Sequence, residues 1–157
     1  MARERTTAGI PAADRVLSLE RVFDAPRDLV WKAMTEREHA ERWWSPKGFT
    51  LTYLEMDVRP GGAWRKCMQP SGGDEICNGG IYREVTRPER LAFTYRVHQY
   101  ETLVTITLAE HAGKTKLTLH QSAFESVDHR DSHLGGWTSS TGRLAEYLAG
   151  KSQAGPR

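Results

Sequence analysis

The sequence has few cysteines, no long apolar segment and no excess of either charge, and each shortage excludes a class of protein. Two cysteines in 157 residues are too few for a disulfide-stapled secreted domain, and without a CxxC pair they form no thiolate metal motif. The formal charge of +2 arises from 22 basic and 20 acidic side chains that are interspersed. The chain therefore lacks the basic patch typical of proteins that bind nucleic acids or anionic membranes.

No apolar run approaches the roughly 20 residues needed to cross a bilayer, so we expect no membrane insertion. The first residues, MARERTTAGIPAAD, also lack the apolar centre of a signal peptide. We therefore expect a cytoplasmic protein, in which Cys67 and Cys77 are reduced and buried. Their symmetric placement about the turn residue Gly72 can put them opposite each other on two strands, but oxidation is not expected in that compartment.

The two ends of the chain are polar and contain proline or glycine without apolar periodicity. We predict flexible tails at residues 1–14 and 150–157 and a single domain at residues 15–149. At the start of this domain, residues 16–23 alternate apolar and polar side chains, as expected for a strand with one exposed face. Arg21 falls on the apolar face, and we expect its guanidinium to make a structural pairing with a carboxylate or with carbonyl groups.

Helical patterns appear only near the two ends of this domain. Two short helices are predicted at residues 24–35, with Asp24 as the N-cap, and at residues 36–44. Between residues 49 and 122, six strand-like runs alternate with glycine- and proline-containing turns, a pattern typical of antiparallel strands. A long amphipathic helix is predicted from about residue 131 to residue 148. The sequence thus predicts an α+β domain in which a curved seven-stranded antiparallel sheet wraps around a long C-terminal helix.

The order of these elements and several segments resemble a known superfamily. The segments are RVFDAPRDLVWKAMTEREHAERWWSPKGF, RPGGAW, GGIYREVTRPERLAFTY and LGGWTSSTGRLAEYL. From about residue 16 to residue 148 the chain resembles the SRPBCC or START-like helix-grip superfamily. Within it, the chain is most similar to bacterial proteins related to the C-terminal domain of the activator of the ninety-kilodalton heat-shock chaperone ATPase. Members variously bind lipids or aromatic metabolites, cyclise polyketides or act on chaperones, so the fold alone does not determine the function.

The resemblance implies a deep cavity between the long helix and the curved sheet, and such cavities are mostly apolar with a few polar groups. Candidate ligand-binding residues come from a lid-like segment after the second short helix, from alternate strand positions and from the C-terminal helix. They are Trp43, Trp44, Phe49, Trp64, Met68, Tyr82, Phe93, Tyr95, Val104, His133, Trp137, Thr141 and Leu144. A register error of one residue would replace a strand's candidates by their neighbours. Aromatic residues at this spacing more often form plain core, and that alternative stays open.

No catalytic motif is recognisable, because GxSxG, HExxH and CxxC patterns are all missing, and catalytic residues stay unassigned. A cavity residue with a shifted pKa could still act as a general acid or base, although each candidate is more often a structural or surface residue. These candidates are Tyr82, Glu84, Tyr95, His98 and His133. Whether the protein is an enzyme is left open, and the missing motifs favour a non-catalytic role. The pair Gly61-Gly62 precedes a strand rather than a helix, which favours a turn over a phosphate-binding loop.

Three of the six histidines lie in the stretch HQSAFESVDHRDSHLGGW, residues 120–137. His129 and His133 are four residues apart, a spacing that metal ligands on one helix face often have. However, His120 is predicted to end the last strand, and the residues just after it to form a loop. An acidic residue such as Asp131 is already explained as a helix cap. We therefore expect neither a metal nor a cofactor, and His133 alone is retained as a polar contact at the cavity mouth.

Three functions from different classes are consistent with the sequence. The first is binding of a small hydrophobic or aromatic molecule in the internal cavity. The second is co-chaperone-like stimulation of a heat-shock chaperone ATPase, and the third is a cyclase or hydrolase activity in the same cavity. The expected partners are accordingly a small hydrophobic molecule and, for the second function, a heat-shock chaperone. We expect no nucleic-acid partner, and a monomer or a homodimer.

Overall fold

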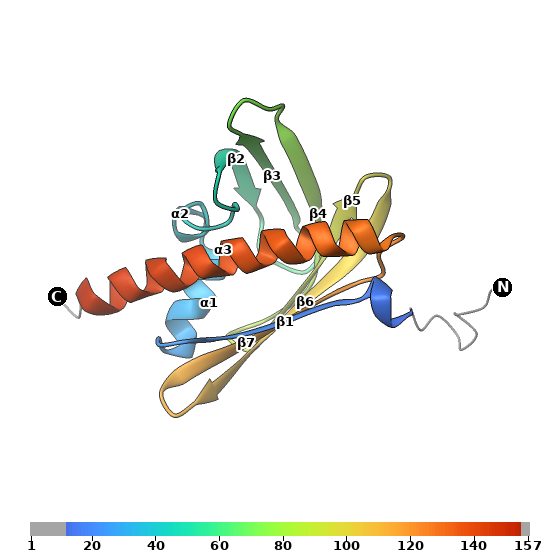
Figure 1. Cartoon of the computed structure of the whole chain (residues 1–157). Helices are drawn as coiled ribbons and strands as arrows, with labels where there is room; N and C mark the ends of the chain where they lie inside the picture. Colours follow the sequence, from blue (N-terminus) through green and yellow to red (C-terminus); the bar gives the residue numbers. More distant parts are fainter. Residues whose placement is uncertain (1–11, 155–157) are drawn as a thin grey trace.

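Seven strands form one curved antiparallel sheet, and a long helix lies across it (Figure 1). The computed structural model describes residues 12–154. The elements in chain order are η1 (Ala13–Arg15), β1 (Leu17–Phe23), α1 (Arg27–Thr35), α2 (Arg37–Ala40), β2 (Phe49–Met56), β3 (Ala63–Pro70), β4 (Ile76–Thr86), β5 (Arg90–Val97), β6 (Tyr100–His111), β7 (Lys114–Ser122) and α3 (Val127–Ala154). This order confirms the predicted α+β fold with two short helices after the first strand.

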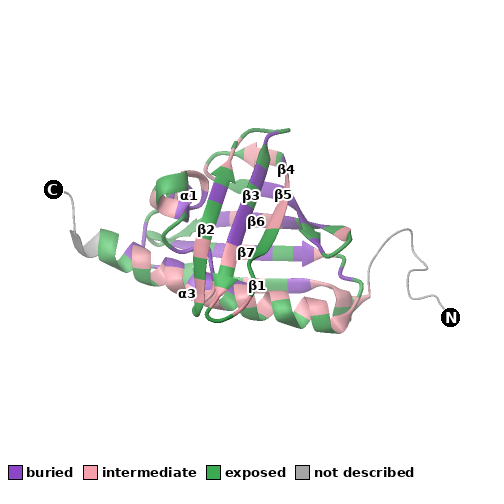
Figure 2. Ribbon diagram, turned by 90° about the horizontal axis from the view of Figure 1, so that it is seen from above, coloured by how far each residue is buried: buried purple, intermediate pink, exposed green. Residues whose placement is uncertain are grey.

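The strands lie in the order β1-β7-β6-β5-β4-β3-β2, so β1 and β2 occupy opposite edges of the sheet. The segment containing α1 and α2 connects these two edges. From β2 to β7, each strand is joined to the next by a turn. All neighbouring strands of the sheet, including β1 and β7, are antiparallel. Seen from above, buried and exposed positions alternate along most strands and α3 runs beside the sheet (Figure 2). The alternation follows from the two-residue period of side chains on a pleated strand.

The two short helices are shorter than the sequence predicted. Helix α1 begins at Arg27, directly after Pro26, rather than at residue 24, and Asp24 is not its cap. Proline fixes φ near the helical value and has no N–H to leave unsatisfied, which suits it to a helix start. Helix α2 ends at Ala40 instead of residue 44, because the chain turns there and places Trp43 and Trp44 in the core.

Strand β1 confirms the predicted two-sided pattern, with Leu17 and Phe23 buried. The Arg21 side chain lies on the same face and contacts α3. Its Nε donates to Thr141 Oγ1 at 3.1 Å and its Nη2 donates to the Thr138 carbonyl at 3.4 Å. The guanidinium therefore has the structural pairing expected for it, with a hydroxyl and a carbonyl of the helix as its acceptors.

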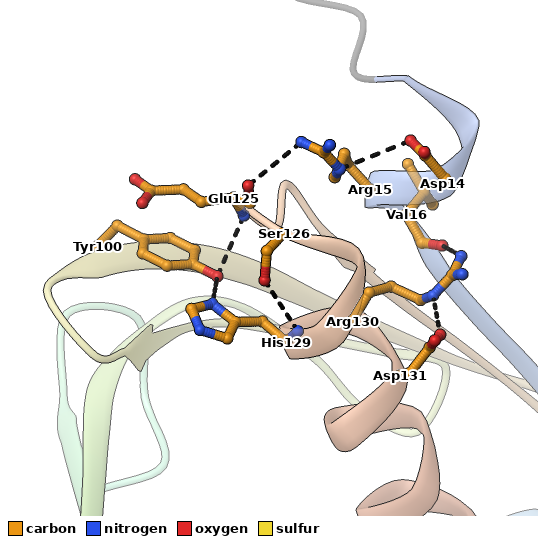
Figure 3. A network of polar contacts seen from close by, with 9 residues as sticks. All are labelled: Asp14, Arg15, Val16, Tyr100, Glu125, Ser126, His129, Arg130 and Asp131. Carbon is orange, nitrogen blue, oxygen red and sulfur yellow. Dashed lines mark hydrogen bonds and ion pairs between the residues drawn. The ribbon is translucent and has the colours of Figure 1, made fainter.

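Helix α3 begins at Val127, four residues earlier than predicted, because Ser126 caps it: the His129 backbone N–H donates to Ser126 Oγ at 3.0 Å (Figure 3). The predicted loop from Phe124 to Asp128 was therefore wrong at Val127 and Asp128, and the cap is Ser126 instead of an aspartate. His129 and His133 consequently share one helix. The first turn is fixed further by a hydrogen bond of 2.8 Å between His129 Nδ1 and the Tyr100 hydroxyl.

At its other end α3 continues to Ala154, into the tail predicted to start at residue 150. Residues 13–15, which overlap the predicted N-terminal tail, form the short helix η1. The remaining parts of the two predicted tails, residues 1–11 and 155–157, lie outside the described residues. Within residues 12–154, no helix is both long enough and apolar enough to span a membrane.

The two cysteines correct a prediction, because Cys67 and Cys77 form a disulfide rather than two reduced thiols. They are directly opposite each other on β3 and β4, which the symmetric placement about the turn had allowed. Cys67 is buried and Cys77 is exposed. The bridge ties together the two strands of the hairpin that forms one wall of the cavity described next.

Candidate ligand-binding cavity

A cavity of about 890 Å³ lies between α3 and the hairpin of β3 and β4, and it extends to the end of β5. Its volume is within the range of small-molecule sites, roughly 300–1,000 Å³. The lining residues are Trp44, Pro46, Lys47, Phe49, Arg65, Lys66, Met68, Ile76, Cys77, Asn78, Gly79, Tyr95, Arg96, Val97, His98, Ser132, His133, Gly135, Gly136, Trp137, Ser139 and Ser140. They include four Lys or Arg side chains and two histidines, but no aspartate or glutamate. The cavity is therefore apolar in part and basic in charge.

The apolar wall is built around Trp44. Its ring stacks on that of Trp137, with centroids 6.4 Å apart, and lies 5.1 Å from the ring of Trp64. Trp64 is buried beside Gly80, its partner in the β3–β4 register, where a Cβ atom would overlap the Thr94 carbonyl oxygen. The Trp64 indole N–H donates to the same carbonyl at 3.0 Å. The missing side chain at Gly80 thus allows the close approach that fixes the large ring at the base of the wall.

The lid-like segment is held against α3 by hydrogen bonds from both sides. Arg143 Nη1 donates to the Ser45 carbonyl at 2.7 Å and to Ser45 Oγ at 2.8 Å. The Lys47 backbone N–H donates to Ser139 Oγ at 2.8 Å. Because Ser45 directly follows Trp44 and Ser139 lines the cavity, these contacts fix the position of the tryptophan ring relative to the helix.

A buried chain of hydrogen bonds fixes Trp137 on the opposite side. Its indole N–H donates to Gln121 Oε1 at 2.9 Å, and Gln121 Nε2 donates to Thr102 Oγ1 at 2.8 Å. The Thr102 hydroxyl in turn donates to the Tyr95 carbonyl at 2.8 Å. Gln121 is completely buried. The cost of burying its amide is offset because both the oxygen and the nitrogen of the amide are hydrogen-bonded. The network links α3, β7, β6 and β5 behind the cavity wall.

Lys66 is the most unusual group in the cavity. It lies on β3 between Trp64 and Met68 and is 3% exposed. Its Nζ lies 4.6 Å from the centre of the Trp44 ring and 5.7 Å from that of Tyr95. Burial lowers the pKa of this ammonium from 10.5 to about 7, because the charged form loses its hydration. Cation–π contact stabilises the charged form only in part.

Two neighbouring groups also have shifted pKa values. Burial, together with the nearby charges of Lys66, His129 and His98, lowers the pKa of His133 to about 4. Burial raises the pKa of the Tyr95 phenol above its usual range, so this hydroxyl stays protonated and donates to Asn78 Oδ1 at 3.3 Å. At neutral pH, His133 and Tyr95 are therefore uncharged, and the ring of His133 packs edge-on against that of Tyr95.

The predicted ligand-binding residues divide into three groups in the structure. Those that line the cavity are Trp44, Phe49, Met68, Tyr95, His133 and Trp137. Trp43, Tyr82 and Phe93 lie around a small void of about 20 Å³ deeper in the core, bordered also by Trp44 and Trp137. Trp64, Val104, Thr141 and Leu144 line neither space and are buried core. Of the predicted strand residues, Trp64, Tyr82, Phe93, Tyr95 and Val104 are buried and Met68 is half-buried.

Three of the five acid–base candidates, Tyr95, His98 and His133, line the cavity, whereas Tyr82 and Glu84 do not. Glu84 lies outside the cavity lining, with its carboxylate 2.9 Å from Arg90 Nε. His98 lines the cavity and its ring stacks on that of His129, which does not line it. Within the described residues, only Cys67, Glu75 and Cys77 have ligand atoms grouped closely enough to hold a metal. The two sulfur atoms of that group are bonded to each other, so they do not offer thiolates.

Several lining residues were missed by the sequence analysis, and Lys66 and Asn78 are the most important. Both face inward at paired positions of β3 and β4. A signal was available, because Trp64 and Met68 were assigned to the inner face of β3 and the residue between them must share it. Lysine is almost never fully buried, so the burial of Lys66 departs from the general pattern.

The curved sheet, the long helix across it and the cavity between them define a helix-grip protein. The chain belongs to the Activator of Hsp90 ATPase homolog 1-like protein family, whose profile matches residues 24–149. Its similarity to bacterial members confirms the resemblance stated above.

Three solved structures show this likeness. A crystal structure of a protein from Nitrosomonas europaea is 28% identical with a TM-score of 0.78, covering 90% of this chain and 99% of the other. A crystal structure of a protein from Chromobacterium violaceum is 28% identical with a TM-score of 0.77, and the match covers 85% of this chain and 96% of the other. The crystal structure of an AHSA1 protein from Silicibacter pomeroyi is 25% identical with a TM-score of 0.78, and the match covers 87% of this chain and 99% of the other. Among curated proteins, no match was found.

Proposed function

We propose that the protein binds a small hydrophobic or aromatic molecule in the cavity between α3 and the β3–β4 hairpin. The observation that carries this proposal is the cavity itself, about 890 Å³ in volume with Trp44, Tyr95 and Trp137 in its wall. Rings held by packing and hydrogen bonds present a preorganised apolar surface, which lowers the entropic cost of binding. The helix-grip fold commonly binds hydrophobic ligands, which supports the same proposal.

A neutral fluorescent probe, N-phenyl-1-naphthylamine, tests the proposal because its emission increases in an apolar site. We expect saturable binding at a stoichiometry of about one, with quenching of tryptophan emission from Trp44 and Trp137. Gly135 offers a way to block the site, since it lines the cavity and a Cβ atom there meets nothing within 4 Å. The variant Gly135→Phe is expected to weaken probe binding at least roughly tenfold, since a ring-sized volume is removed from the cavity.

Gly150 provides a matched control for this variant. It lies on the same helix, a Cβ atom there also meets nothing within 4 Å, and it does not line the cavity. Gly150→Phe is therefore expected to bind the probe as the unmodified protein does. If the unmodified protein does not bind the probe, or if both phenylalanine variants bind it equally well, the cavity is not the binding site proposed here.

The description of the family favours a second candidate, stimulation of a heat-shock chaperone ATPase. Its test is the ATPase rate of the cognate Hsp90-type chaperone measured with and without this protein. A stimulated rate that Gly135→Phe leaves unchanged would assign the chaperone contact to another surface. No stimulation at a large excess of the protein would remove this candidate.

A further inference from the structure

The charge of the cavity restricts the class of ligand that it can hold. Lys66 and Asn78 face each other across β3 and β4 at the inner wall, and both line the cavity. Among the described side chains, no carboxylate forms an ion pair with the Lys66 ammonium, whose neighbours are the rings of Trp44 and Tyr95. A buried amine without a counter-ion is unfavourable in its charged form, unless a ligand supplies the anion.

The titratable groups that line the cavity together with Lys66 do not supply this anion. They are Arg65 on β3, Tyr95 and Arg96 on β5, His98 after β5, His133 on α3 and Lys47 after α2. All are cationic or neutral at neutral pH. The ammonium lies close to the ring centres of both Trp44 and Tyr95, at 4.6 Å and 5.7 Å. The inner wall therefore combines one positive group with flat apolar surface, and the mouth adds further positive charge.

We infer that the physiological ligand is a small organic carboxylate with an aromatic or apolar body, whose carboxylate pairs with the Lys66 ammonium while its body packs against Trp44 and Tyr95. This inference rests on the proposed function and narrows it to one chemical class. A carboxylate brought to Lys66 makes a charge-assisted hydrogen bond in a site of low dielectric constant. One amide hydrogen of Asn78, directly beside Lys66 in the register, donates to the Arg96 carbonyl at 3.4 Å, and the other offers a second donor.

In the ligand-free protein, the Lys66 amine is mostly unprotonated at a pH above its pKa. Binding of a carboxylate at such a pH favours protonation of this amine. With that pKa near 7, the amine is mostly neutral at pH 8, and an anion next to it favours the charged form. Binding of the carboxylate at pH 8 is therefore coupled to the uptake of close to one proton from the buffer. A neutral ligand of the same shape takes up none.

The matched pair 1-naphthaleneacetate and 1-naphthaleneacetamide tests this inference, since the two differ in charge but hardly in shape. Isothermal titration at pH 7 is expected to give tighter binding of the carboxylate by roughly tenfold or more, the range of a hydrogen bond to a charged group. Lys66→Met is expected to abolish the preference while retaining the amide. Methionine keeps an unbranched apolar stem, so this variant should fold.

Lys114→Met is the control, because Lys114 is an exposed strand lysine outside the cavity lining. It is expected to retain the full preference for the carboxylate. Titration at pH 8 in two buffers of different ionisation enthalpy then measures proton uptake, expected in the unmodified protein and in Lys114→Met but not in Lys66→Met.

Three results would overturn the inference. The first is equal binding of the acid and the amide by the unmodified protein. The second is a preference that survives in Lys66→Met, since the arginines at the mouth would then supply it. The third is failure of both naphthalene compounds to bind although N-phenyl-1-naphthylamine does, in which case the proposed function stands without this narrower form. If that neutral probe also fails to bind, the proposed function falls together with the inference.

Discussion

Replacement of Lys66 by methionine is expected to stabilise the protein at neutral pH, and the gain is expected to shrink as the pH rises. The pKa of Lys66 is about 7 in the folded protein and near its ordinary 10.5 when the chain unfolds. At roughly 1.4 kcal/mol for each pKa unit, burial penalises the charged amine by up to about 5 kcal/mol. Above pH 7, Lys66 in the folded protein releases its proton, and the neutral amine does not incur this penalty.

The sign of the pH dependence follows from proton binding. Between pH 7 and pH 10.5 the unfolded chain holds the lysine proton and the folded protein does not, so stability increases with pH in this window. Linkage with these two pKa values gives an increase of about 2 kcal/mol from pH 7 to pH 9 for this group alone. The penalty is fully present below pH 7. Burial raises the pKa of Tyr82 and Tyr95, so measurements should stay below pH 10.

The assay is urea unfolding at pH 6, 7, 8 and 9, followed by tryptophan fluorescence. The difference in unfolding free energy between Lys66→Met and the unmodified protein should be largest at pH 6 and fall by about 2 kcal/mol between pH 7 and pH 9. Lys114→Met should show no such trend, because that side chain is exposed. Parallel stability curves for Lys66→Met and the unmodified protein over this range would refute the assignment of a buried, unpaired amine.

Two further predictions concern other parts of the same wall. His133→Leu should reduce the loss of unfolding free energy between pH 7 and pH 5 by about 1–2 kcal/mol, measured by urea unfolding. The reason is that the histidine protonates near pH 6.5 in the unfolded chain but only near pH 4 in the folded protein. An unchanged acid sensitivity in the variant would contradict the burial of His133. Conversion of Cys67 and Cys77 to serine should lower the free energy of unfolding by about 2–3 kcal/mol, the value expected for a loop of this length. Dithiothreitol should lower the stability of the unmodified protein by a similar amount, and a native thiol titration that finds two free thiols in the unreduced protein would contradict the bridge.

The architecture was predictable because its signals are local. An antiparallel meander with a covering helix follows from strand periodicity, evenly spaced turns and one long amphipathic segment. None of these patterns depends on the individual side-chain contacts. Arg21 shows how far such reasoning reaches. Its position on an otherwise apolar face required a polar partner, and the structure provides Thr141 and the Thr138 carbonyl.

The start of α3 was mispredicted because its first turn carries little apolar periodicity. The signal there is a cap, Ser126, whose hydroxyl accepts the His129 N–H, and a serine before an irregular polar segment is weak evidence for a helix. The disulfide was missed for a different reason. The facing positions of Cys67 and Cys77 were predictable from the turn, but their oxidation state was inferred from an expected compartment rather than from geometry.

The candidate site was predictable only in its apolar half. Trp44, Tyr95 and Trp137 were expected in the wall and line the cavity. Lys66 was not among the candidates, although two-residue alternation places it on the same face as Trp64 and Met68; lysine is rarely buried. The residue that contradicts the general rule about burial is thus the one that gives the cavity its chemical preference.

The decisive measurement is a crystal structure of the protein with 1-naphthaleneacetate. We expect the naphthalene ring between α3 and the β3–β4 hairpin, packed against Trp44 and Tyr95, with the carboxylate at about 2.7–2.9 Å from Lys66 Nζ, as in a charge-assisted hydrogen bond. A ligand bound outside the cavity, or one whose carboxylate points to the arginines at the mouth and away from Lys66, would contradict this expectation.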